Sequence, residues 1–379
     1  MNSDIYPTNH YQTLYICDEN NKYTYFINNG QNYKINHQTE KNINTSNPNI
    51  IFNIDNNIDS NVYISGIKNY WNNCYFNSGL QILVSCEKFV KEIESYNSSH
   101  NDLQLTSLVY DAIKKLLNGI NYNPLELLKY FVKLNNNVFG VQSCSQNFIR
   151  TLLRNLNNEF LIYEKRNFKI EGYNPSNKEN ESFINFLHLN KLYQESSLLS
   201  IFSGISKNYS KERCNICGFL IEEYSYYYFI DQNIYLDGIY SKCNFSDILK
   251  KNFGQNNNLT MNCPRCKNEI IIKENSKFIK LPEVFIFTLE RFQAGNNNVE
   301  IIPDDFIYMD EYIDQSLKGI KTKYELFAIN IRLGETKNFG HEKCQVKRNE
   351  IWLEFDDETS DVKQKSYNKD SYGLFYKRL

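Results

Sequence analysis

The sequence lacks the features that would place it in a membrane, in the secretory pathway or on a nucleic acid. It contains no run of about eighteen or more apolar residues, which a membrane-spanning helix requires. Its first residues, MNSDIYPTNH, lack the apolar core of a secretory signal. The formal net charge is -2, and neither a basic stripe nor an acidic tail is present. We therefore expect a cytoplasmic or nuclear protein with no membrane and no nucleic-acid partner.

The chain contains ten cysteines, but in the reducing compartment that we expect for it they should not form disulfides. In a reducing compartment, cysteines serve as metal ligands, catalytic thiols or buried apolar residues. Hydrophobic residues make up 41% of the 379 residues and aromatic residues 15%, which excludes a disordered chain and is enough for a sizeable core. The roles of the cysteines must therefore be judged from their spacing and surroundings.

Residues 1–60 differ from the rest of the chain. Two strand-like runs, at residues 13–16 and 23–27, precede Asn-rich sequence at about 42–60 that is typical of a linker. We interpret residues 1–60 as a leader with a small β unit and a linker. Residues 61–379 are interpreted as the main domain.

The main domain contains helical periodicity first and strand patterns afterwards. Apolar residues recur at three- and four-residue steps over 105–117, and Ser145 is a predicted helix cap. Residues 281–289 predict a strand buried on both faces. Further strands of one antiparallel sheet are predicted at 324–333, 343–347, 351–355 and 372–376. This order indicates an α+β fold.

Cys74 stands between an Asn-rich loop and an apolar stretch that predicts the first turns of a buried helix. At a helix N-terminus, the positive end of the dipole and the unpaired backbone N–H groups favour the nucleophilic thiolate. Asn72, two residues earlier, can donate its amide to an oxyanion near the sulfur. For a cysteine considered singly, a buried structural role is the simpler interpretation.

Four further cysteines form two C-x-x-C pairs, Cys214 with Cys217 and Cys263 with Cys266. Two such turns present four thiolates to one ion, which predicts a closed, tetrahedral Zn²⁺ site with a structural role. The long stretch between the pairs predicts that the ion clamps the tips of two long hairpins. Unmetallated thiols and a redox pair are the alternatives.

Among the five histidines, only His341 has a setting typical of catalysis. It follows Gly340 and begins a predicted strand, and Asp356 follows the next predicted strand. An antiparallel hairpin would bring Asp356 beside the imidazole, where an acid fixes the tautomer and stabilises the imidazolium. Either residue alone is more simply a surface residue, but with Cys74 they predict a Cys-His-Asp triad.

Together these motifs resemble the ubiquitin-specific protease family of ubiquitin carboxyl-terminal hydrolases, which are papain-like cysteine peptidases. The resemblance runs from Gly66 to the C-terminus and depends on the cysteine box, the histidine box and the cysteine pairs between them. The cysteine box consists here of Gly66, Asn69, Asn72, Cys74, Tyr75, Asn77, Ser78, Leu80 and Gln81. Matching segments also occur, in family order, at residues 142–149, 202–204, 281–292, 324–334, 340–341 and 352–357.

The resemblance implies an architecture like a right hand. The thumb would be helical, at about 66–160, the fingers would carry zinc, at about 200–280, and the palm would be mainly 281–379. Ubiquitin, or a ubiquitin-like modifier, and its conjugates would be the partners of a monomeric enzyme.

The resemblance also implies the reaction, which is hydrolysis of the isopeptide bond after the C-terminal Gly-Gly of ubiquitin. Cys74 would attack the carbonyl, His341 would act as base and then acid, and Asp356 would orient His341. Asn72 would stabilise the oxyanion, and Asp357 would have a supporting role.

Five positions depart from the family pattern. Trp71 stands where the family has glycine, and Cys144 and Asn147 stand where it has acidic residues. Glu342 replaces the tyrosine after the histidine, and Arg332 replaces a histidine on the preceding strand. These positions leave two alternatives open, a protease for another ubiquitin-like modifier and a catalytically weak ubiquitin-binding scaffold. A zinc-ribbon nucleic-acid binder is disfavoured by the near-neutral charge.

Overall fold

The computed structural model describes residues 23–28, 31–36 and 65–379, the last range with gaps at 101, 136–142, 165–182, 188–193, 233, 235–241, 255–256, 275, 293–298, 318, 335–338 and 367–368. The chain divides into two compact units, Met1–Asn49 and Ile50–Leu379. Within the described residues, no helix is both long and apolar enough to cross a bilayer.

The first unit contains an antiparallel hairpin of β1 (Tyr23–Asn28) and β2 (Gln31–Asn36), in which Asn28 pairs with Gln31. The predicted strand at 23–27 is confirmed as β1. The second strand was not predicted, although the Asn-Gly sequence between the two is a common signal for a hairpin. The run at 13–16 and the Asn-rich linker lie outside the described residues.

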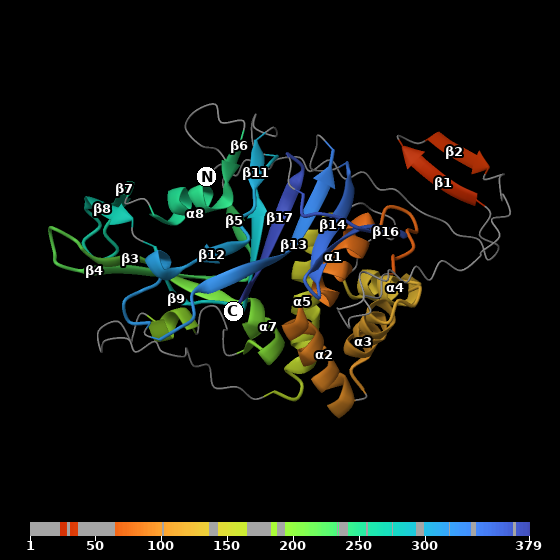
Figure 1. Cartoon of the computed structure of the whole chain (residues 1–379). Coiled ribbons are helices and arrows are strands. Elements are labelled where there is room, and N and C mark those ends of the chain that lie inside the picture. Colours follow the sequence, from red (N-terminus) through yellow and green to blue (C-terminus); the bar gives the residue numbers. More distant parts are fainter. Residues whose placement is uncertain are drawn as a thin grey trace. The chain divides into compact units, whose positions relative to one another are not determined.

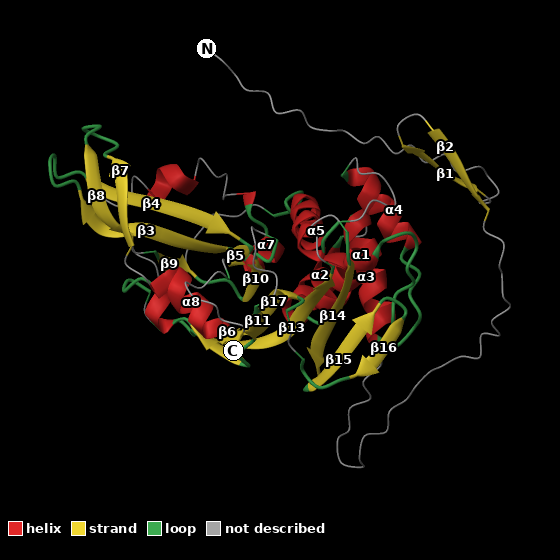
Figure 2. Ribbon diagram, turned by 90° about the horizontal axis from the view of Figure 1, so that it is seen from above, coloured by secondary structure: helices red, strands yellow, loops and turns green. Residues whose placement is uncertain are grey.

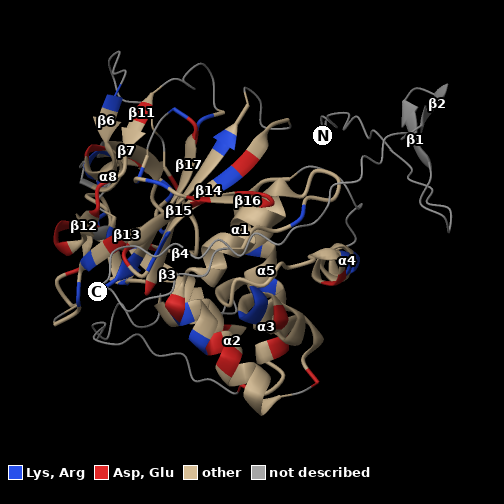
Figure 3. Cartoon of the chain, turned by 45° about the vertical axis from the view of Figure 1, so that its right-hand side comes forward, with Lys and Arg blue, Asp and Glu red and all other residues tan. Residues whose placement is uncertain are grey.

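The second unit begins with a group of helices. They are α1 (Cys74–Val84), α2 (Glu87–Ser99), α3 (Gln104–Leu117), α4 (Leu125–Leu134), α5 (Ser145–Phe160) and α7 (Ser197–Phe202). Of these, α2 and α7 were not predicted individually. Figure 3 shows acidic and basic residues interspersed along α2 and α3, so the exposed sides of these helices do not form a stripe of one charge. The prediction that Ser145 caps a helix is wrong, because Ser145 is the first helical residue of α5 and Cys144 is its N-cap.

Helix α1 lies at the centre of this unit, and all eleven of its residues are buried. It packs against α5, where the Phe76 and Phe148 rings lie 4.6 Å apart. Gly79 makes this packing possible, because a Cβ atom there would lie 2.6 Å from the Phe148 ring. The apolar stretch after Cys74 is therefore a core helix, as predicted.

The predicted sheet has eight strands. Its order is β16-β15-β14-β13-β17-β10-β5, and β12 also pairs with β13. The strands are β5 (Ile230–Gln232), β10 (Val284–Leu289), β12 (Phe306–Tyr308), β13 (Lys323–Leu333), β14 (His341–Arg348), β15 (Ile351–Asp356), β16 (Thr359–Val362) and β17 (Ser371–Arg378). The pairs are antiparallel except β5, which runs parallel to β10. Figure 1 shows the blue strands of this sheet, β13, β14 and β17, beside the orange and yellow helices.

Strand β10 shows why both faces of the sheet are covered. Its six residues are all buried, as predicted. Val284 and Ile286 join the core that includes the helices, whereas Phe285 and Phe287 join a second core on the opposite face. Alternation of side chains between two apolar cores is what a strand in the middle of a layered structure requires.

Two hairpins extend from the sheet at the end opposite helices α1 to α5 (Figure 2). One consists of β3 (Gly204–Arg213) and β4 (Leu220–Tyr227), and the other of β7 (Asn257–Asn262) and β8 (Glu269–Glu274). Strand β9 (Lys277–Lys280) joins β3. The smaller elements are β6 (Lys242–Asn244), α8 (Phe245–Gly254), β11 (Glu300–Ile302) and η2 (Asp310–Tyr312).

Candidate functional site

The site begins at Cys74, the first residue of α1, whose side chain is almost completely buried. Its N-cap residue, Asn73, makes no side-chain hydrogen bond to the helix start. The Asn73 amide instead donates to Asn77 Oδ1 at 2.9 Å, and its oxygen accepts from the Tyr70 N–H at 2.5 Å. Asn73 therefore shapes the loop and leaves the N-terminal dipole of α1 available to the neighbouring sulfur.

His341 and Asp356 come from the two strands of one hairpin. His341 is the first residue of β14 and Asp356 is the last residue of β15. Imidazole Nε2 lies 2.5 Å from Asp356 Oδ1, and both side chains are half-exposed. A hydrogen bond between Cys74 and the imidazole is the largest of the effects that raise the pKa of His341 to about 9; Asp356 adds to it and partial burial opposes it. The structure thus brings Cys74, His341 and Asp356 together.

Asp357 faces the loop before Cys74. Its two carboxylate oxygens accept hydrogen bonds from Asn69 Nδ2 at 2.7 Å and from Asn77 Nδ2 at 2.8 Å. Its backbone carbonyl accepts from the Ile67 N–H at 2.8 Å. Burial raises the pKa of Asp357, and the two amide donors oppose that effect. Asp357 therefore joins the end of the β14–β15 hairpin to both sides of the nucleophile.

Gly66 explains how close this contact is. A Cβ atom at Gly66 would lie 2.4 Å from the backbone oxygen of Glu358 and 2.6 Å from that of Asp357. Any larger residue would push the loop away from the turn after β15. Gly66, Asn69 and Asn77 thus share one structural task, which is to hold the Asp357 turn against the start of α1. The side-chain ligand atoms of His341, Asp356 and Asp357 lie within 4.8 Å of one another, because His341 bonds to Asp356 and Asp357 is the next residue in the chain.

Sequence reasoning missed a third support, Arg348 at the end of β14. Its guanidinium donates to Gln81 Oε1 at 2.6 Å and to Ser85 Oγ at 2.8 Å, both at the far end of α1. Gln81 in turn donates to the Ser65 carbonyl at 2.8 Å. Burial lowers the pKa of Arg348 to about 10. Nothing in the local sequence indicates this contact, because the partners are separated by 267 positions.

The loop before Cys74 is the most strained part of the site. Trp71 has φ 53° and Asn72 has φ 62°, so two consecutive residues adopt the left-handed conformation. Both are exposed, and 53% of Trp71 is accessible to solvent. The bulky residue that stands in place of a family glycine therefore occupies a position that favours glycine. Asn72 remains a predicted oxyanion donor.

Two of the residues that depart from the family pattern, Arg332 and Glu342, contact each other near His341. Arg332 and Glu342 occupy paired positions on β13 and β14 and form a buried ion pair. The sequence presented them as two separate anomalies, and only the strand register brings them together.

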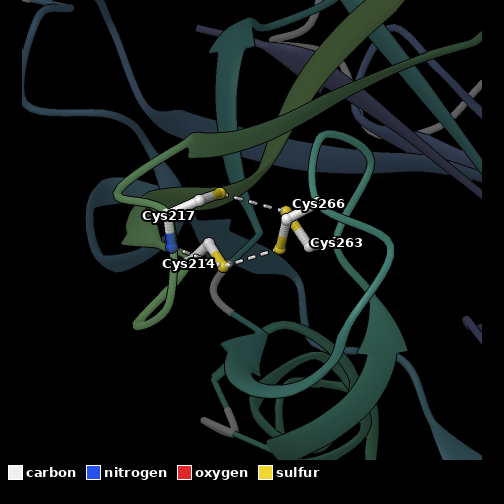
Figure 4. A group of neighbouring side chains, drawn as sticks. All are labelled: Cys214, Cys217, Cys263 and Cys266. Atoms are coloured by element: carbon white, nitrogen blue, oxygen red, sulfur yellow. Dashed lines mark hydrogen bonds between the residues drawn. The ribbon is translucent and has the colours of Figure 1, made fainter.

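The four cysteines of the two C-x-x-C pairs form one cluster at the tips of the two hairpins (Figure 4). Cys214 Sγ lies 3.7 Å from Cys266 Sγ, and Cys217 Sγ lies 3.7 Å from Cys263 Sγ. Tetrahedral zinc with Zn–S bonds of about 2.3 Å separates its sulfurs by about 3.8 Å. The cluster is therefore consistent with a structural zinc site.

The two turns that hold the cluster have the same backbone pattern. The Gly218 N–H donates to the Cys214 carbonyl at 2.9 Å, and the Lys267 N–H donates to the Cys263 carbonyl at 2.9 Å. Gly218 has φ 67° and Lys267 has φ 63°. Glycine supplies the left-handed residue of the first turn, and a lysine takes the same conformation in the second turn.

Comparison with known proteins gives a family match and similar relatives. The family model described as ubiquitin carboxyl-terminal hydrolase matches residues 65–376. Ubiquitin carboxyl-terminal hydrolase 4 of Arabidopsis thaliana is 25% identical over 336 residues, which cover 81% of this chain and 87% of that protein. Ubiquitin carboxyl-terminal hydrolase 12 of Salmo salar is 22% identical over 331 residues, which cover 83% of this chain and 86% of that protein.

Solved structures give the same fold. A chain of the SAGA DUB module of Ubp8, Sgf11, Sus1 and Sgf73 bound to monoubiquitin aligns with a TM-score of 0.64 at 17% identity, covering 83% of this chain and 69% of that chain. A chain of the yeast SAGA DUB module with an Sgf73 mutant aligns with a TM-score of 0.61 at 18% identity, covering 83% and 68% respectively. The predicted α+β fold is confirmed.

The backbone at Trp71 can be tested by substitution. We expect the free energy of unfolding of Trp71→Gly to be about 1 kcal/mol higher than that of Trp71→Ala. The reason is that glycine adopts the left-handed conformation without the strain that a Cβ atom brings. Urea denaturation measures the difference. Ile120, which is equally exposed at 53% and is not among the residues with positive φ, is the matched control. At Ile120 the alanine variant should be more stable than the glycine variant. If alanine were also the more stable residue at Trp71, the proposed strain would be contradicted.

Proposed function

The chain belongs to the ubiquitin carboxyl-terminal hydrolase family of cysteine-type deubiquitinases, and on that premise we propose that it hydrolyses the isopeptide bond after the C-terminal Gly-Gly of ubiquitin through Cys74, His341 and Asp356. One observation carries this proposal, namely that the imidazole hydrogen-bonds to Asp356 and has a pKa that Cys74 and Asp356 together raise to about 9. This is the arrangement that an activated thiol nucleophile requires. The proposed place of action is the cytoplasm or nucleus, where thiols remain reduced.

In the acylation step, the imidazole takes the proton of the Cys74 thiol. Because Nε2 is occupied by Asp356, the nitrogen that serves the thiol is Nδ1. The Cys74 sulfur attacks the carbonyl carbon of the last glycine of ubiquitin and forms a C–S bond. Asn72 donates to the resulting oxyanion. The imidazolium then protonates the departing lysine Nζ as the C–N bond breaks, leaving a thioester.

Deacylation reverses the proton movements. The imidazole accepts a proton from water, the resulting hydroxyl attacks the thioester carbonyl, and the C–S bond breaks. Ubiquitin leaves with a free carboxyl group, which loses its proton to solvent, and the Cys74 thiolate and imidazolium are restored. Asp357 takes no proton in this scheme. Its role is to hold Asn69 and Asn77, and through them the loop that carries Asn72.

A second candidate substrate is a different ubiquitin-like modifier. The family's acidic residues that meet the basic tail of ubiquitin are replaced here by half-buried Cys144 and exposed Asn147. Neither carries a carboxylate that would pair with an arginine in the tail. This observation favours a modifier whose C-terminal segment is less basic than that of ubiquitin.

Zinc would stabilise the fold and take no part in the reaction. Cys214, Cys217, Cys263 and Cys266 would hold Zn²⁺ with four thiolates, which leaves no position for a metal-bound water. The ion would cross-link the β3–β4 hairpin to the β7–β8 hairpin. The small apolar cluster beneath the cysteines, which includes Ile221, Ile270 and Ile272, is too small to hold two hairpins together by itself.

The first test is covalent labelling. Ubiquitin with a C-terminal electrophile should label the wild-type chain, and Cys74→Ala should abolish labelling because it removes the attacking sulfur. Cys86→Ala, which removes another buried cysteine at a helix start, is the matched control and should label normally. Labelling by another modifier's probe in place of ubiquitin would support the second substrate. Failure of all probes, with ubiquitin still bound, would identify a scaffold and refute the proposal.

The second test is the pH dependence of catalysis. Protonated His341 is needed to expel the lysine, so kcat/KM for a ubiquitin amide substrate should fall at high pH with a midpoint near 9, the pKa of His341. Asp356→Asn should move that midpoint to lower pH, because the carboxylate stabilises the imidazolium. Asp361→Asn removes an exposed acid on the neighbouring strand β16 and should leave it unchanged. An unaltered midpoint in Asp356→Asn would exclude the orienting role.

The third test concerns the metal. We expect about one zinc per chain by elemental analysis, and Cys214→Ser should lose both the metal and several degrees of thermal stability. Cys243→Ala alters a buried cysteine that lies between the two pairs in sequence and outside the cluster, so it should retain zinc. A metal-free wild-type protein with unchanged stability in Cys214→Ser would refute the zinc site.

A further inference from the structure

A buried charge pair lies directly beside the proposed base. Glu342 follows His341 in β14, and Arg332 is its paired residue in β13. The Arg332 and Glu342 side chains are 1% and 0% exposed, and Nη1 of Arg332 donates to Oε1 of Glu342. Ionised groups are almost never buried this completely without a partner, and each side chain here depends on the other.

The second carboxylate oxygen of Glu342 binds the start of α5. Oε2 accepts from the Ser145 N–H at 2.9 Å and from the Ser145 hydroxyl, and the Asn330 amide contributes a longer bond of 3.3 Å. The side chain of Cys144, the N-cap residue of α5, does not cap the helix. Glu342 therefore satisfies an unpaired N–H group at the positive end of the α5 dipole from a different element.

Arg332 is held on its other sides. It donates to the Ser143 carbonyl at 3.4 Å, and its guanidinium lies 5.6 Å from the Phe292 ring and 5.9 Å from the Tyr372 ring. Its backbone N–H donates to the Asp370 carbonyl at 2.9 Å. The guanidinium thus has a fixed place beside one oxygen of the Glu342 carboxylate, while the other oxygen binds Ser145.

This contact links the strand of His341 to the helix of Cys74 through α5. Helix α5 packs against α1 at Phe148, where Gly79 permits close approach. Glu342 fixes the first residues of β14 to the first residues of α5. The path from His341 to Cys74 therefore runs through Glu342, Ser145 and Phe148, in addition to the path through Asp357.

We infer that Arg332 and Glu342 are positioning residues that hold His341 in reach of Cys74 by fastening the start of β14 to the start of α5. The catalytic consequence rests on the proposed function. The order of the two charges matters, because the Ser145 N–H and hydroxyl require an acceptor. The Glu342 carboxylate provides one, and a guanidinium does not. Exchanging the two charges would preserve an ion pair but place a cation against the Ser145 N–H and the positive end of α5.

The test uses Glu342→Gln, which keeps the shape of the side chain but removes its charge. We expect kcat for the ubiquitin amide substrate to fall about 10- to 100-fold with KM within about twofold, because a base displaced by about an ångström loses this much rate. The milder Ser145→Ala variant, which removes one hydrogen bond to Glu342, should lower kcat about threefold with little loss of stability. The exchange variant, Arg332→Glu with Glu342→Arg, should not restore activity.

A second measurement does not depend on ubiquitin. Alkylation of Cys74 by iodoacetamide, followed by mass spectrometry of its peptide, should slow about tenfold at about pH 6 in Glu342→Gln but change less than twofold at about pH 10, where thiols are ionised without help from an imidazolium. Lys280→Met disrupts another buried pair, Lys280–Glu195, and is the control that should lower the thermal midpoint while leaving alkylation unchanged.

The outcomes separate the two proposals. Normal kcat and alkylation with a lowered thermal midpoint in Glu342→Gln, or full activity in the exchange variant, would overturn the positioning role. A wild-type chain that cleaves no ubiquitin substrate but shows the expected alkylation change would refute the proposed function and keep the positioning role.

Discussion

The site depends on the two hydrogen bonds that Asp357 accepts from Asn69 and Asn77. They join residues 288 and 280 positions apart, and they press the turn after β15 against the loop before Cys74. Without that contact, the helix with the thiol and the hairpin with the imidazole would still be joined by core packing and by the bonds of Arg348 to the far end of α1, but no amide-to-carboxylate bonds would join them at the loop before Cys74. Gly66 has the same purpose, because a side chain there would separate the two segments.

Local patterns were enough to predict the elements that carry the site. The β14–β15 hairpin follows from two short alternating runs, and a hairpin brings its first and last residues together, which is why His341 and Asp356 were paired correctly in space. The C-x-x-C spacing predicted turns at hairpin tips, and the cluster lies there. In each case the decisive information lies within one hairpin or one turn.

Contacts between distant segments were not predictable in the same way. Ser145 was expected to cap its own helix, but its N–H and hydroxyl bind Glu342 from a strand 197 positions away. Arg348 reaches Gln81 and Ser85 across the core, and β5 joins β10 in parallel where an antiparallel sheet was expected. Propensity and periodicity describe neighbours in sequence, whereas these contacts depend on register and on which helix end meets which strand.

The complete burial of α1 divides the site into a fixed half and an adjustable half. The thiol is attached to a helix whose eleven residues are all enclosed, so it cannot shift unless the densely packed core rearranges with it. The imidazole and its acid occupy the ends of strands and remain half-exposed. Any adjustment that a bound substrate requires is therefore easier on the histidine side than at the sulfur.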